Sequence, residues 1–554
     1  MAEISSADHS VTPPRIRIPR DYNAAHDLLE RNLAAGRGDR IAFIDDRGSC
    51  TYAELNRRVN RFASGLTAIG LRREERVVLC MLDTIDWPVA FLGSIKAGIV
   101  PVAINTMLRP QDYEYMLRDS RAGALLVSQA LLPAFEQGIM AAPALRAVVV
   151  SAAPGAASEA LPKLARETVE FDTLLASGTD DFACAETVAD EPCFWLYSSG
   201  STGSPKGTVH VHSSLIETAE LYARPILGIT EDDVGFSAAK LFFAYGLGNG
   251  LTFPMSVGAT SVLMAERPTP DAVFRRLTGE APAALAGLGR RPTIYYGVPT
   301  LYAGMLASSA FPERSQMSMR VAASAGEALP EQVGTHFTER TGTEILDGIG
   351  STEMLHIFIS NRAGQVRYGT TGKPVPGYEL KLIGEDGNPV DDGEVGDLYI
   401  SGPSSAAQYW NQREKTRDTF QGIWTRSGDK YQRDADGFYT YAGRSDDMMK
   451  VSGQYVSPFE VESAVASHPA VFEAAVVGAR DADKLLKPKA FVVLKEPGRA
   501  SDALAQEIKA YVKDRLTPFK YPRWVEFVEE LPKTATGKIQ RFRLRDREGF
   551  SGQE

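Results

Sequence analysis

The stretch that decides the expected fold is YSSGSTGSPKG, residues 197–207. Its glycines let the backbone approach a ligand closely, and its serine and threonine hydroxyls add hydrogen-bond donors, so the stretch can wrap a polyphosphate. The apolar run before it, 194–197, predicts a buried strand, while VHVH at 209–212 and a helix capped by Ser214 and Glu217 follow. It is not a Walker loop, because Pro205 stands where that motif needs its second glycine. Composition alone is equally typical of a flexible surface loop.

The order of these residues resembles the phosphate loop of the adenylate-forming superfamily, which includes acyl-CoA ligases, firefly luciferases and peptide-synthetase adenylation domains. Further motifs of that superfamily follow in the same order: AGEAL (325–329), DGIGSTEM (347–354), SGDKY (427–431) with GRSDDMMK (443–450), and LPKTATGKIQR (531–541). Within the superfamily, residues 240–254 and 451–462 look most like benzoate-CoA ligases and their hydroxybenzoate relatives.

Length and composition limit the class of protein. The 554 residues are 44% apolar, which is enough for large cores and more than one domain. The net charge of −10 argues against nucleic acid as a partner, because phosphate neutralisation needs a basic face. The four cysteines form no C-x-x-C pair, so neither a disulfide framework nor a zinc site is indicated. No secretory or membrane-spanning segment is evident, and we expect a cytoplasmic monomer or homodimer.

The pattern of apolar runs predicts an α/β fold. Strand-like runs at 76–82, 124–128 and 147–151 alternate with helical stretches such as 51–70, which favours layers with largely parallel strands. This large multi-layer domain is expected to occupy residues 1–445 and to carry the ATP and acyl sites.

After Asp446 the pattern restarts as a small α+β unit, residues 446–554. Strands are expected near 474–477, 490–494 and 524–528, and a helix from 501 to about 516. By the resemblance this unit is mobile, Asp446 is its hinge, and its loop TATGK carries the adenylation lysine, Lys538.

The resemblance implies an ATP-dependent reaction in which a carboxylate is joined to AMP and then passed to the thiol of coenzyme A, with Mg²⁺ on the pyrophosphate. Such chemistry depends on positioning and on positive charge near the α-phosphate. The implied catalytic residues are Lys538, Glu353, Thr352 and Asp446, and Glu353 with Thr202 would hold the metal. The implied ATP or AMP contacts are Ser198, Ser199, Gly200, Ser201, Thr202, Gly203, Lys206, Gly326, Glu327, Ala328, Asp347, Gly348, Ser351, Asp429 and Arg444.

Two of these residues lie in the later motifs. Asp429 resembles the carboxylate that accepts both ribose hydroxyls, a task suited to two acceptor oxygens. Arg444 either binds ribose or phosphate, or forms a salt bridge at the hinge. Lys450 and Gly453 would contact coenzyme A.

The segment LFFAYGLGN, 241–249, predicts a flat slot for an aromatic ring, although an aromatic cluster can equally be plain core. The expected acyl contacts are Phe243, Ala244, Tyr245, Gly246, Ile349, Gly350 and His356. His356 either bonds a ring substituent or closes the pocket. No acidic residue lies in the segment, which disfavours an amino-acid substrate with its ammonium group.

Three interpretations compete. The first is an aryl-CoA ligase acting on benzoate, 4-hydroxybenzoate or 2-aminobenzoate; the second is an aryl adenylation enzyme that loads a carrier protein. The third is a homologue that binds acyl-adenylates without turnover, and the presence of Lys538, Glu353, Thr352 and Asp429 counts against it. His210 and His212 share a strand face, but packing is favoured over a metal pair because no third ligand is in view.

Overall fold

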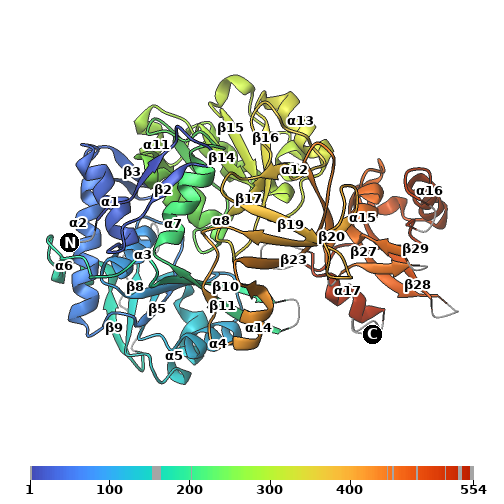
Figure 1. The fold of residues 1–554 in the computed structure, drawn as a ribbon. Helices are drawn as coiled ribbons and strands as arrows, with labels where there is room; N and C mark the ends of the chain where they lie inside the picture. Colours follow the sequence, from blue (N-terminus) through green and yellow to red (C-terminus); the bar gives the residue numbers. More distant parts are fainter. Residues whose placement is uncertain are drawn as a thin grey trace. The chain divides into compact units, whose positions relative to one another are not determined.

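The computed structural model describes residues 3–152, 164–200, 203–445, 447–451, 454–481, 485–517, 520–533 and 539–548 (Figure 1). Internal contacts divide the chain into two compact units. Unit 1 is Met1–Leu380 with Ile400–Arg426, and unit 2 is Lys381–Tyr399 with Ser427–Glu554. Within the described residues, no helix is both long enough and apolar enough to cross a membrane.

The first large sheet of unit 1 has eight strands in the order β21-β11-β10-β6-β5-β7-β8-β9. Their bounds are β21 (Gln408–Tyr409), β11 (Gly203–Val211), β10 (Pro192–Gly200), β6 (Val100–Ala103), β5 (Arg76–Cys80), β7 (Ala124–Ser128), β8 (Ala147–Ser151) and β9 (Glu167–Glu170). The strands from β10 to β9 are parallel, whereas β11 and β21 are antiparallel to their neighbours. The strands predicted from the apolar runs at 76–82, 124–128 and 147–151 are confirmed.

The second large sheet of unit 1 has nine strands in the order β18-β17-β16-β15-β14-β12-β13-β3-β4. Their bounds are β18 (Lys373–Pro374), β17 (Ile357–Ser360), β16 (Ile345–Gly350), β15 (Val321–Ser324), β14 (Ile294–Gly297), β12 (Val234–Ser237), β13 (Thr260–Val262), β3 (Ile41–Asp45) and β4 (Gly48–Thr51). The strands from β16 to β3 are parallel, as expected for an α/β layer. A separate N-terminal pair is β1 (Ser6–Asp8) with β2 (Arg15–Arg17).

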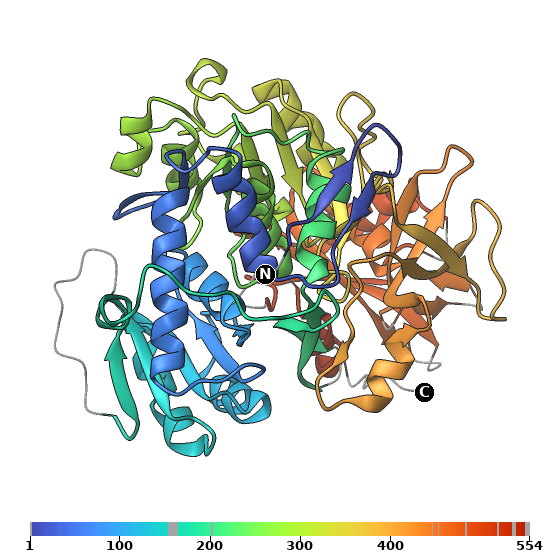
Figure 2. The same ribbon diagram turned by 60° about the vertical axis from the view of Figure 1, so that its left-hand side comes forward.

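Helices cover these sheets; α3 (Asp86–Lys96) is buried on all sides, and α2 (Tyr52–Ala68) buries one apolar stripe. In α2, the buried residues Leu55, Val59, Phe62 and Leu66 recur at helical spacing, and Thr51 caps the helix by accepting the N–H of Glu54. α2 packs on α3 and also contacts α1 (Ala24–Ala34), and these helices are blue in Figure 2.

The remaining helices of unit 1 are short. They are α4 (Pro110–Ser120), α5 (Glu136–Ala141), α6 (Phe171–Ser177), α7 (Ser213–Thr218), α8 (Ala244–Leu247), α9 (Phe253–Val257), α10 (Pro270–Leu277), α11 (Ala283–Leu288), α12 (Pro299–Ala307), α13 (Glu331–Thr341) and α14 (Arg413–Thr419), with the 3-10 helices η1 (Gln129–Phe135) and η4 (Arg314–Gln316) and the π-helical turns η2 (Ala219–Ala223) and η3 (Gly248–Thr252).

Unit 2 contains a small sheet and an α+β body. The small sheet comprises most of β19 (Glu379–Ile383), β20 (Val395–Ser401) and β23 (Trp424–Arg433), with β24 (Tyr439–Arg444) beside β23; the first residues of β23 pair with β22 (Phe420–Gln421) in unit 1. The body contains β25 (Met449–Val451), β26 (Gln454–Val456), β27 (Val471–Arg480), β28 (Leu486–Leu494), β29 (Trp524–Phe527), α15 (Pro458–Ala466), α16 (Asp502–Lys513), α17 (Arg541–Arg547) and the 3-10 helix η5 (Pro497–Arg499). The predicted C-terminal strands and helix correspond to β27, β28, β29 and α16.

The division into units differs from the predicted boundary at residues 445 and 446. Strands β19, β20, β23 and β24 group mainly with the C-terminal residues. The stretch KPVPG at residues 373–377, just before Lys381, and the pair Gly402 and Pro403, just after Tyr399, are rich in proline and glycine, but no boundary was predicted there. Asp446 lies outside the described residues, and its role as a hinge stays a prediction.

Candidate active site

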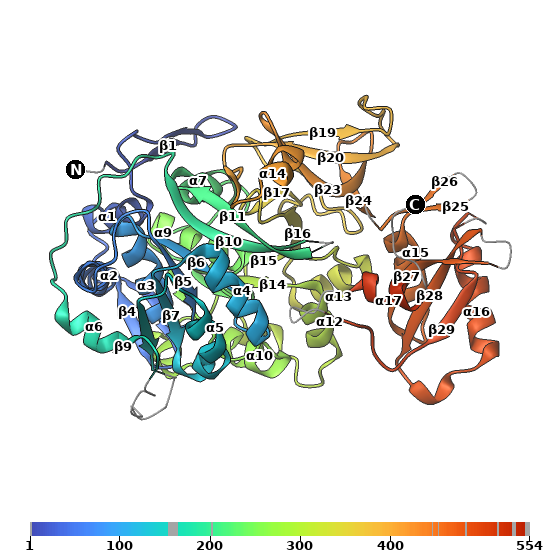
Figure 3. The ribbon, with the colours of Figure 1, turned by 90° about the horizontal axis from the view of Figure 1, so that it is seen from below.

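The stretch 197–207 forms the end of a β-hairpin rather than a loop between distant elements. β10 and β11 pair antiparallel, with Ser198 opposite Lys206 and Gly200 opposite Gly203. The two strands run side by side in green in Figure 3. Ser201 and Thr202, the predicted phosphate and metal contacts at the tip, lie outside the described residues.

Helix α4 anchors both strands of this hairpin. The Tyr115 hydroxyl donates to the backbone oxygen of Pro205 at 3.1 Å, and the Tyr197 hydroxyl donates to Asp119 Oδ2 at 2.7 Å. Asp119 lies one helical turn after Tyr115 on α4, so a single helix face holds residues of both strands. The backbone beside the predicted phosphate contacts is therefore fixed from one side.

The predicted capping box after the hairpin is wrong. β11 continues to Val211, and α7 begins at Ser213 with His212 as its N-cap and no side-chain cap bond. Ser214 therefore lies inside the first turn. Glu217 is partly buried instead of reaching back to the helix start, and burial raises the pKa of its carboxyl to about 8.

His210 and His212 pack as buried neutral rings. His210 stacks on Phe194 with ring centroids 5.2 Å apart, and its Nε2 donates to the backbone oxygen of Thr352 at 2.8 Å. Burial lowers the pKa of His210 to about 4 and that of His212 to about 3. Across the described part of the chain, no group of three or more His, Cys, Asp or Glu side chains could hold a metal ion. Packing, the favoured interpretation of this pair, agrees with these contacts.

Glu353 lies against the hairpin. Its Oε1 accepts the Ser198 hydroxyl at 3.2 Å and the Tyr409 hydroxyl at 2.7 Å, and the Lys206 ammonium lies 4.0 Å from the same oxygen. The Glu353 backbone oxygen accepts the N–H of Ala406 at 2.8 Å. Among the described residues, Oε2 makes no hydrogen bond. This carboxylate oxygen fits a hard divalent cation such as Mg²⁺, which prefers oxygen ligands.

Two neighbouring parallel strands bring together the predicted adenine residues. In the pairing of β15 with β16, Ser324 lies opposite Asp347. The residues Gly326, Glu327 and Ala328 follow β15 and therefore lie beside the later part of β16. Asp347 is 4% exposed, and this burial raises the pKa of its carboxyl well above the usual range. Ser351 and Thr352 continue from the end of β16.

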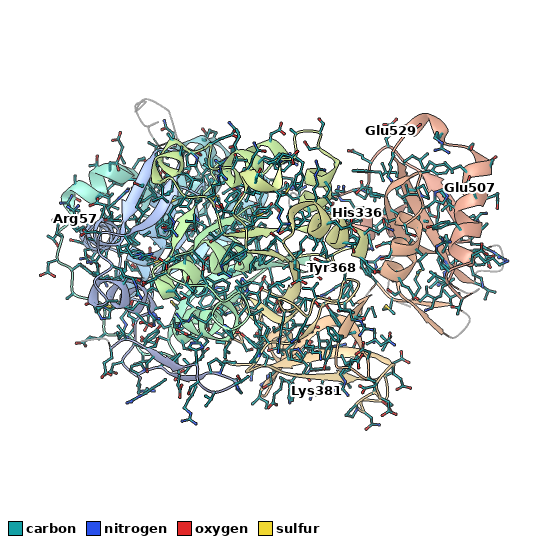
Figure 4. All side chains as sticks on the ribbon, turned by 90° about the horizontal axis from the view of Figure 1, so that it is seen from above. Arg57, His336, Tyr368, Lys381, Glu507 and Glu529 are labelled. Carbon is teal, nitrogen blue, oxygen red and sulfur yellow. The ribbon has the colours of Figure 1, made fainter. Side chains whose placement is uncertain are left out.

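Glycines in β16 allow its close pairing with β17. A Cβ at Gly348 would lie 2.8 Å from the backbone oxygen of Ile359, and one at Gly350 would lie 2.5 Å from that of His356. Tyr368, labelled in Figure 4, fixes the start of β16, because its hydroxyl accepts the N–H of Ile345 at 3.0 Å. Strand β16 is thus held at its start by a hydrogen bond and at positions 348 and 350 by pairing that leaves no room for a side chain.

His356 connects the predicted acyl segment to β17. Its Nε2 lies 3.3 Å from the backbone oxygen of Tyr245 and 3.2 Å from Asn249 Oδ1. Because a backbone carbonyl only accepts, Nε2 carries the proton. Burial lowers the pKa of His356 to about 3, so the ring is neutral. A Cβ at Gly248 would lie 2.4 Å from this ring, which shows that the approach requires glycine.

The aromatic residues of the acyl segment divide into two groups. Tyr245 faces His356 and Tyr296 at ring distances of 5.6 and 6.4 Å, whereas Phe243 packs on Phe242 at 4.4 Å. Ala244 begins the single-turn helix α8, and a Cβ at Gly246 would lie 2.0 Å from the backbone oxygen of Lys240, so the segment turns tightly there. Ile349 lies on β16.

Sequence patterns did not identify several residues of this site. Tyr409 lies on the edge strand β21, which pairs with β11. It is 203 residues from Lys206 in the sequence. Tyr222, Phe253 and Tyr296 surround His356 or Tyr245 from π-helical η2, α9 and β14. No local pattern marks these residues, because long-range packing alone brings them together.

Unit 2 pairs two of the predicted nucleotide residues with each other. Asp429 on β23 lies opposite Arg444 on β24, and their side chains form an ion pair at 3.1 Å. The Arg444 guanidinium also donates to the backbone oxygen of Ser427 at 3.2 Å. Arg444 therefore forms a salt bridge, but its place at a hinge stays a prediction. Its binding of ribose or phosphate stays a prediction.

The remaining predicted residues of unit 2 have no described side chains. Lys450 lies on β25, but only its backbone is described. Gly453 and Lys538 lie outside the described residues. Asp447 forms ion pairs with Arg545 and, at 4.0 Å, with Arg541 on α17, which begins three residues after Lys538.

Comparison with known proteins identifies both parts of the chain. Residues 29–410 match the family described as AMP-binding enzyme, and residues 460–538 match the AMP-binding enzyme C-terminal domain. The chain is 61% identical over 547 residues to the benzoate--CoA ligase of Thauera aromatica, covering 98% of this chain and 100% of the relative.

Solved structures are similar along almost the whole length. A benzoate CoA ligase from Burkholderia xenovorans LB400 has a TM-score of 0.85 at 56% identity and covers 95% of this chain and 100% of its own. The anthranilate CoA ligase AuaEII in complex with anthranoyl-AMP has a TM-score of 0.86 at 42% identity, with coverage of 96% and 98%. The α/β architecture, with a large N-terminal domain and a smaller C-terminal domain, is confirmed. This chain belongs to the AMP-binding enzyme family.

Proposed function

We propose that the chain is an AMP-forming acid–thiol ligase that converts benzoate, or a close ring-substituted benzoate, to its coenzyme A thioester. The observation that carries the proposal is that Glu353, from the segment after β16, contacts Ser198 and Lys206 of the β10–β11 hairpin, while His356 of the same segment contacts Tyr245. Similarity to a benzoate--CoA ligase over 98% of the chain supports the same conclusion.

The reaction has two steps with ATP and coenzyme A as co-substrates. An oxygen of the carboxylate attacks the α-phosphate of ATP, pyrophosphate leaves, and aryl-AMP forms. The coenzyme A thiol then attacks the aryl carbonyl as a thiolate, and AMP leaves. The first step gives the acyl group a good leaving group, which a carboxylate lacks.

Residues of unit 1 bind and position the reactants in this proposal. Backbone and hydroxyl groups of the hairpin hold the phosphates, and Lys206 supplies positive charge. Glu353, with Thr202, would hold Mg²⁺ through oxygen ligands. When bound, Mg²⁺ supplies a Lewis acid for the departing pyrophosphate. Asp347 and the segment 326–328 hold the adenine.

The aryl group would lie against Tyr245, with Phe243, Ala244, Gly246, Ile349, Gly350 and His356 forming the rest of its surroundings. Aromatic neighbours favour a flat ring. His356 is neutral, so it offers no charge to a substrate ammonium or carboxylate. The alternative substrates remain 4-hydroxybenzoate and 2-aminobenzoate, and the alternative acceptor is a carrier-protein thiol.

Residues of unit 2 complete the proposal. Asp429 binds the ribose hydroxyls, Lys538 neutralises charge at the α-phosphate, and Asp446 is the hinge between the two steps. Lys450 and Gly453 contact coenzyme A. We also propose a cytoplasmic enzyme that is a monomer or a homodimer.

Product analysis tests this function. The purified protein is incubated with benzoate, ATP, Mg²⁺ and coenzyme A, and the products are separated by chromatography. Benzoyl-CoA, AMP and pyrophosphate in equal amounts are expected. Formation of ADP would contradict the AMP-forming chemistry, and acyl transfer only to a phosphopantetheinylated carrier protein would favour the alternative.

A further inference from the structure

Tyr409 is fixed at the edge of the eight-stranded sheet, beside the hairpin. It lies opposite Thr208 in the pairing of β21 with β11, and the flanking N–H groups of Ala407 and Trp410 donate to Val209 and Gly207 at 2.9 and 2.7 Å. Its own N–H donates to Thr416 Oγ1 at 3.1 Å. Tyr409 is 3% exposed, and its ring contacts that of Phe420 with centroids 5.3 Å apart. The hydroxyl is therefore placed by a backbone ladder and by packing.

The Tyr409 hydroxyl lies between an ammonium and a carboxylate. It donates to Glu353 Oε1 at 2.7 Å and accepts from Lys206 Nζ at 3.2 Å. The same ammonium lies 4.2 Å from the centre of the Tyr409 ring, a favourable position over the face of an aromatic ring. Hydrogen bonds to a charged group are stronger than those between neutral groups, so this hydroxyl holds both side chains firmly.

We propose that Tyr409 is the positioning residue for Glu353 and Lys206, an inference that rests on the proposed roles of those two residues. The hydroxyl bonds to Oε1, so that Oε2 would be the oxygen that holds the cation. It also keeps the ammonium and the carboxylate at 4.0 Å, instead of in a closer ion pair that would neutralise both charges. In the proposed function, Lys206 supplies its charge to the phosphates and Glu353 would hold the metal.

The variant Tyr409→Phe removes the hydroxyl and keeps the ring, its contact with Phe420 and the backbone ladder. Removal of a group that orients a metal ligand commonly weakens metal binding about ten- to a hundredfold. We expect the Mg²⁺ concentration for half-maximal ATP–pyrophosphate exchange to rise about tenfold. The kcat at saturating Mg²⁺ should change by less than about threefold, because the hydroxyl touches no reacting atom.

A binding measurement gives a second readout that does not need turnover. Calorimetric titration of ATP with and without Mg²⁺ yields the ratio of the two Kd values for each protein. The Kd for ATP without Mg²⁺ divided by the Kd with Mg²⁺ should fall about tenfold in Tyr409→Phe. The matched control is Tyr52→Phe, which removes another buried hydroxyl of unit 1, one that donates to the backbone oxygen of Ala259 at 2.7 Å. The control should keep the ratio of the natural protein.

A double variant separates positioning from general loss of structure. In a Glu353→Gln background, Tyr409→Phe should cause little further change in Mg²⁺ dependence, because both changes disturb the same contact. Independent effects in the double variant, or an unchanged Kd ratio in a Tyr409→Phe protein of unchanged Tm, would overturn the inference. If the natural protein bound MgATP but catalysed no exchange with any aryl acid, the proposed function would fail, while the Kd ratio would still decide the role of Tyr409.

Discussion

The two units hold their candidate functional residues by different kinds of contact. In unit 1, Glu353 and His356 are held by hydroxyl, amide and backbone groups on packed strands, and His356 is 2% exposed. In unit 2, Asp429 is buried but is held by an ion pair with Arg444, whose side chain is 42% exposed. An ion pair with one exposed partner is weakened by solvent and salt. We therefore expect unit 1 to be a preorganised binding site and unit 2 to supply charges at particular steps.

The largest expected effect tests the charge that unit 2 supplies. Lys538→Ala should slow aryl-adenylate formation at least about a hundredfold, because the lysine offsets charge while pyrophosphate leaves. Thioester formation from supplied benzoyl-AMP should be nearly unchanged. Lys533, which pairs with Glu473 at 2.7 Å in the same segment, gives the control Lys533→Ala, expected to retain both half-reactions. Equal loss of both half-reactions in Lys538→Ala would contradict the expectation that unit 2 supplies this charge only during adenylate formation.

A substitution at Asp446, the predicted hinge, tests whether unit 2 acts differently in the two half-reactions. Asp446→Pro should spare adenylation and reduce thioester formation by more than about tenfold, because proline fixes φ near −65° and prevents rotation there. The two rates are measured by pyrophosphate exchange and by thioester formation from supplied adenylate. Asp446→Ala leaves φ unrestricted and should keep most of both rates. Full thioester formation in the proline variant would place the pivot elsewhere.

Glu353→Gln tests the metal contact of unit 1. The amide removes the charge and keeps the shape, so the Mg²⁺ concentration for half-maximal adenylation should rise at least about tenfold. Pyrophosphate exchange across a series of Mg²⁺ concentrations measures the effect. Glu339→Gln, an exposed position on α13, is the control. An unchanged Mg²⁺ requirement in Glu353→Gln would remove the metal role from this residue.

The smallest expected effect concerns Glu217, a partly buried carboxyl of unit 1. The pKa of Glu217 is raised to about 8 from 4.5 by burial, so the folded form keeps its proton over a range in which the unfolded chain loses it. Glu217 therefore lowers the free energy of unfolding more and more as pH rises from about 4.5 to about 8, and this loss is complete above pH about 8. The Tm of Glu217→Gln relative to the natural protein should therefore rise by about 2–4 °C between pH 5 and pH 8. A difference independent of pH would show that Glu217 is ionised in the folded state.

The sequence predicted those parts of the fold and site that depend on local patterns. Apolar runs located β5, β7 and β8, and the order of glycine and hydroxyl residues located the hairpin. Parallel pairing of β15 with β16 then brought the segment after Ser324, which includes Gly326, beside the β16 residues that follow Asp347.

Residues brought together by long-range pairing could not be predicted in this way. Tyr409 reaches Glu353 only because β21 adds to the edge of β11, and a two-residue strand has no periodicity. Ser214 and Glu217 had the spacing of a capping box, but β11 ends at Val211 and the helix begins at Ser213, one residue before the expected cap. The domain boundary expected at residues 445 and 446 stays a prediction.

The central claim, that the preorganised site of unit 1 activates aryl carboxylates, is tested most directly by ATP–pyrophosphate exchange with benzoate, hexanoate and phenylalanine. A flexible chain loses ordering entropy beside Tyr245, and an ammonium would be buried without an acidic partner. We expect kcat/KM for benzoate to exceed both others by at least about a hundredfold. In His356→Ala, the ranking of hydroxy- and aminobenzoates should change more than the rate with benzoate. Equal kcat/KM for hexanoate and benzoate would contradict the account.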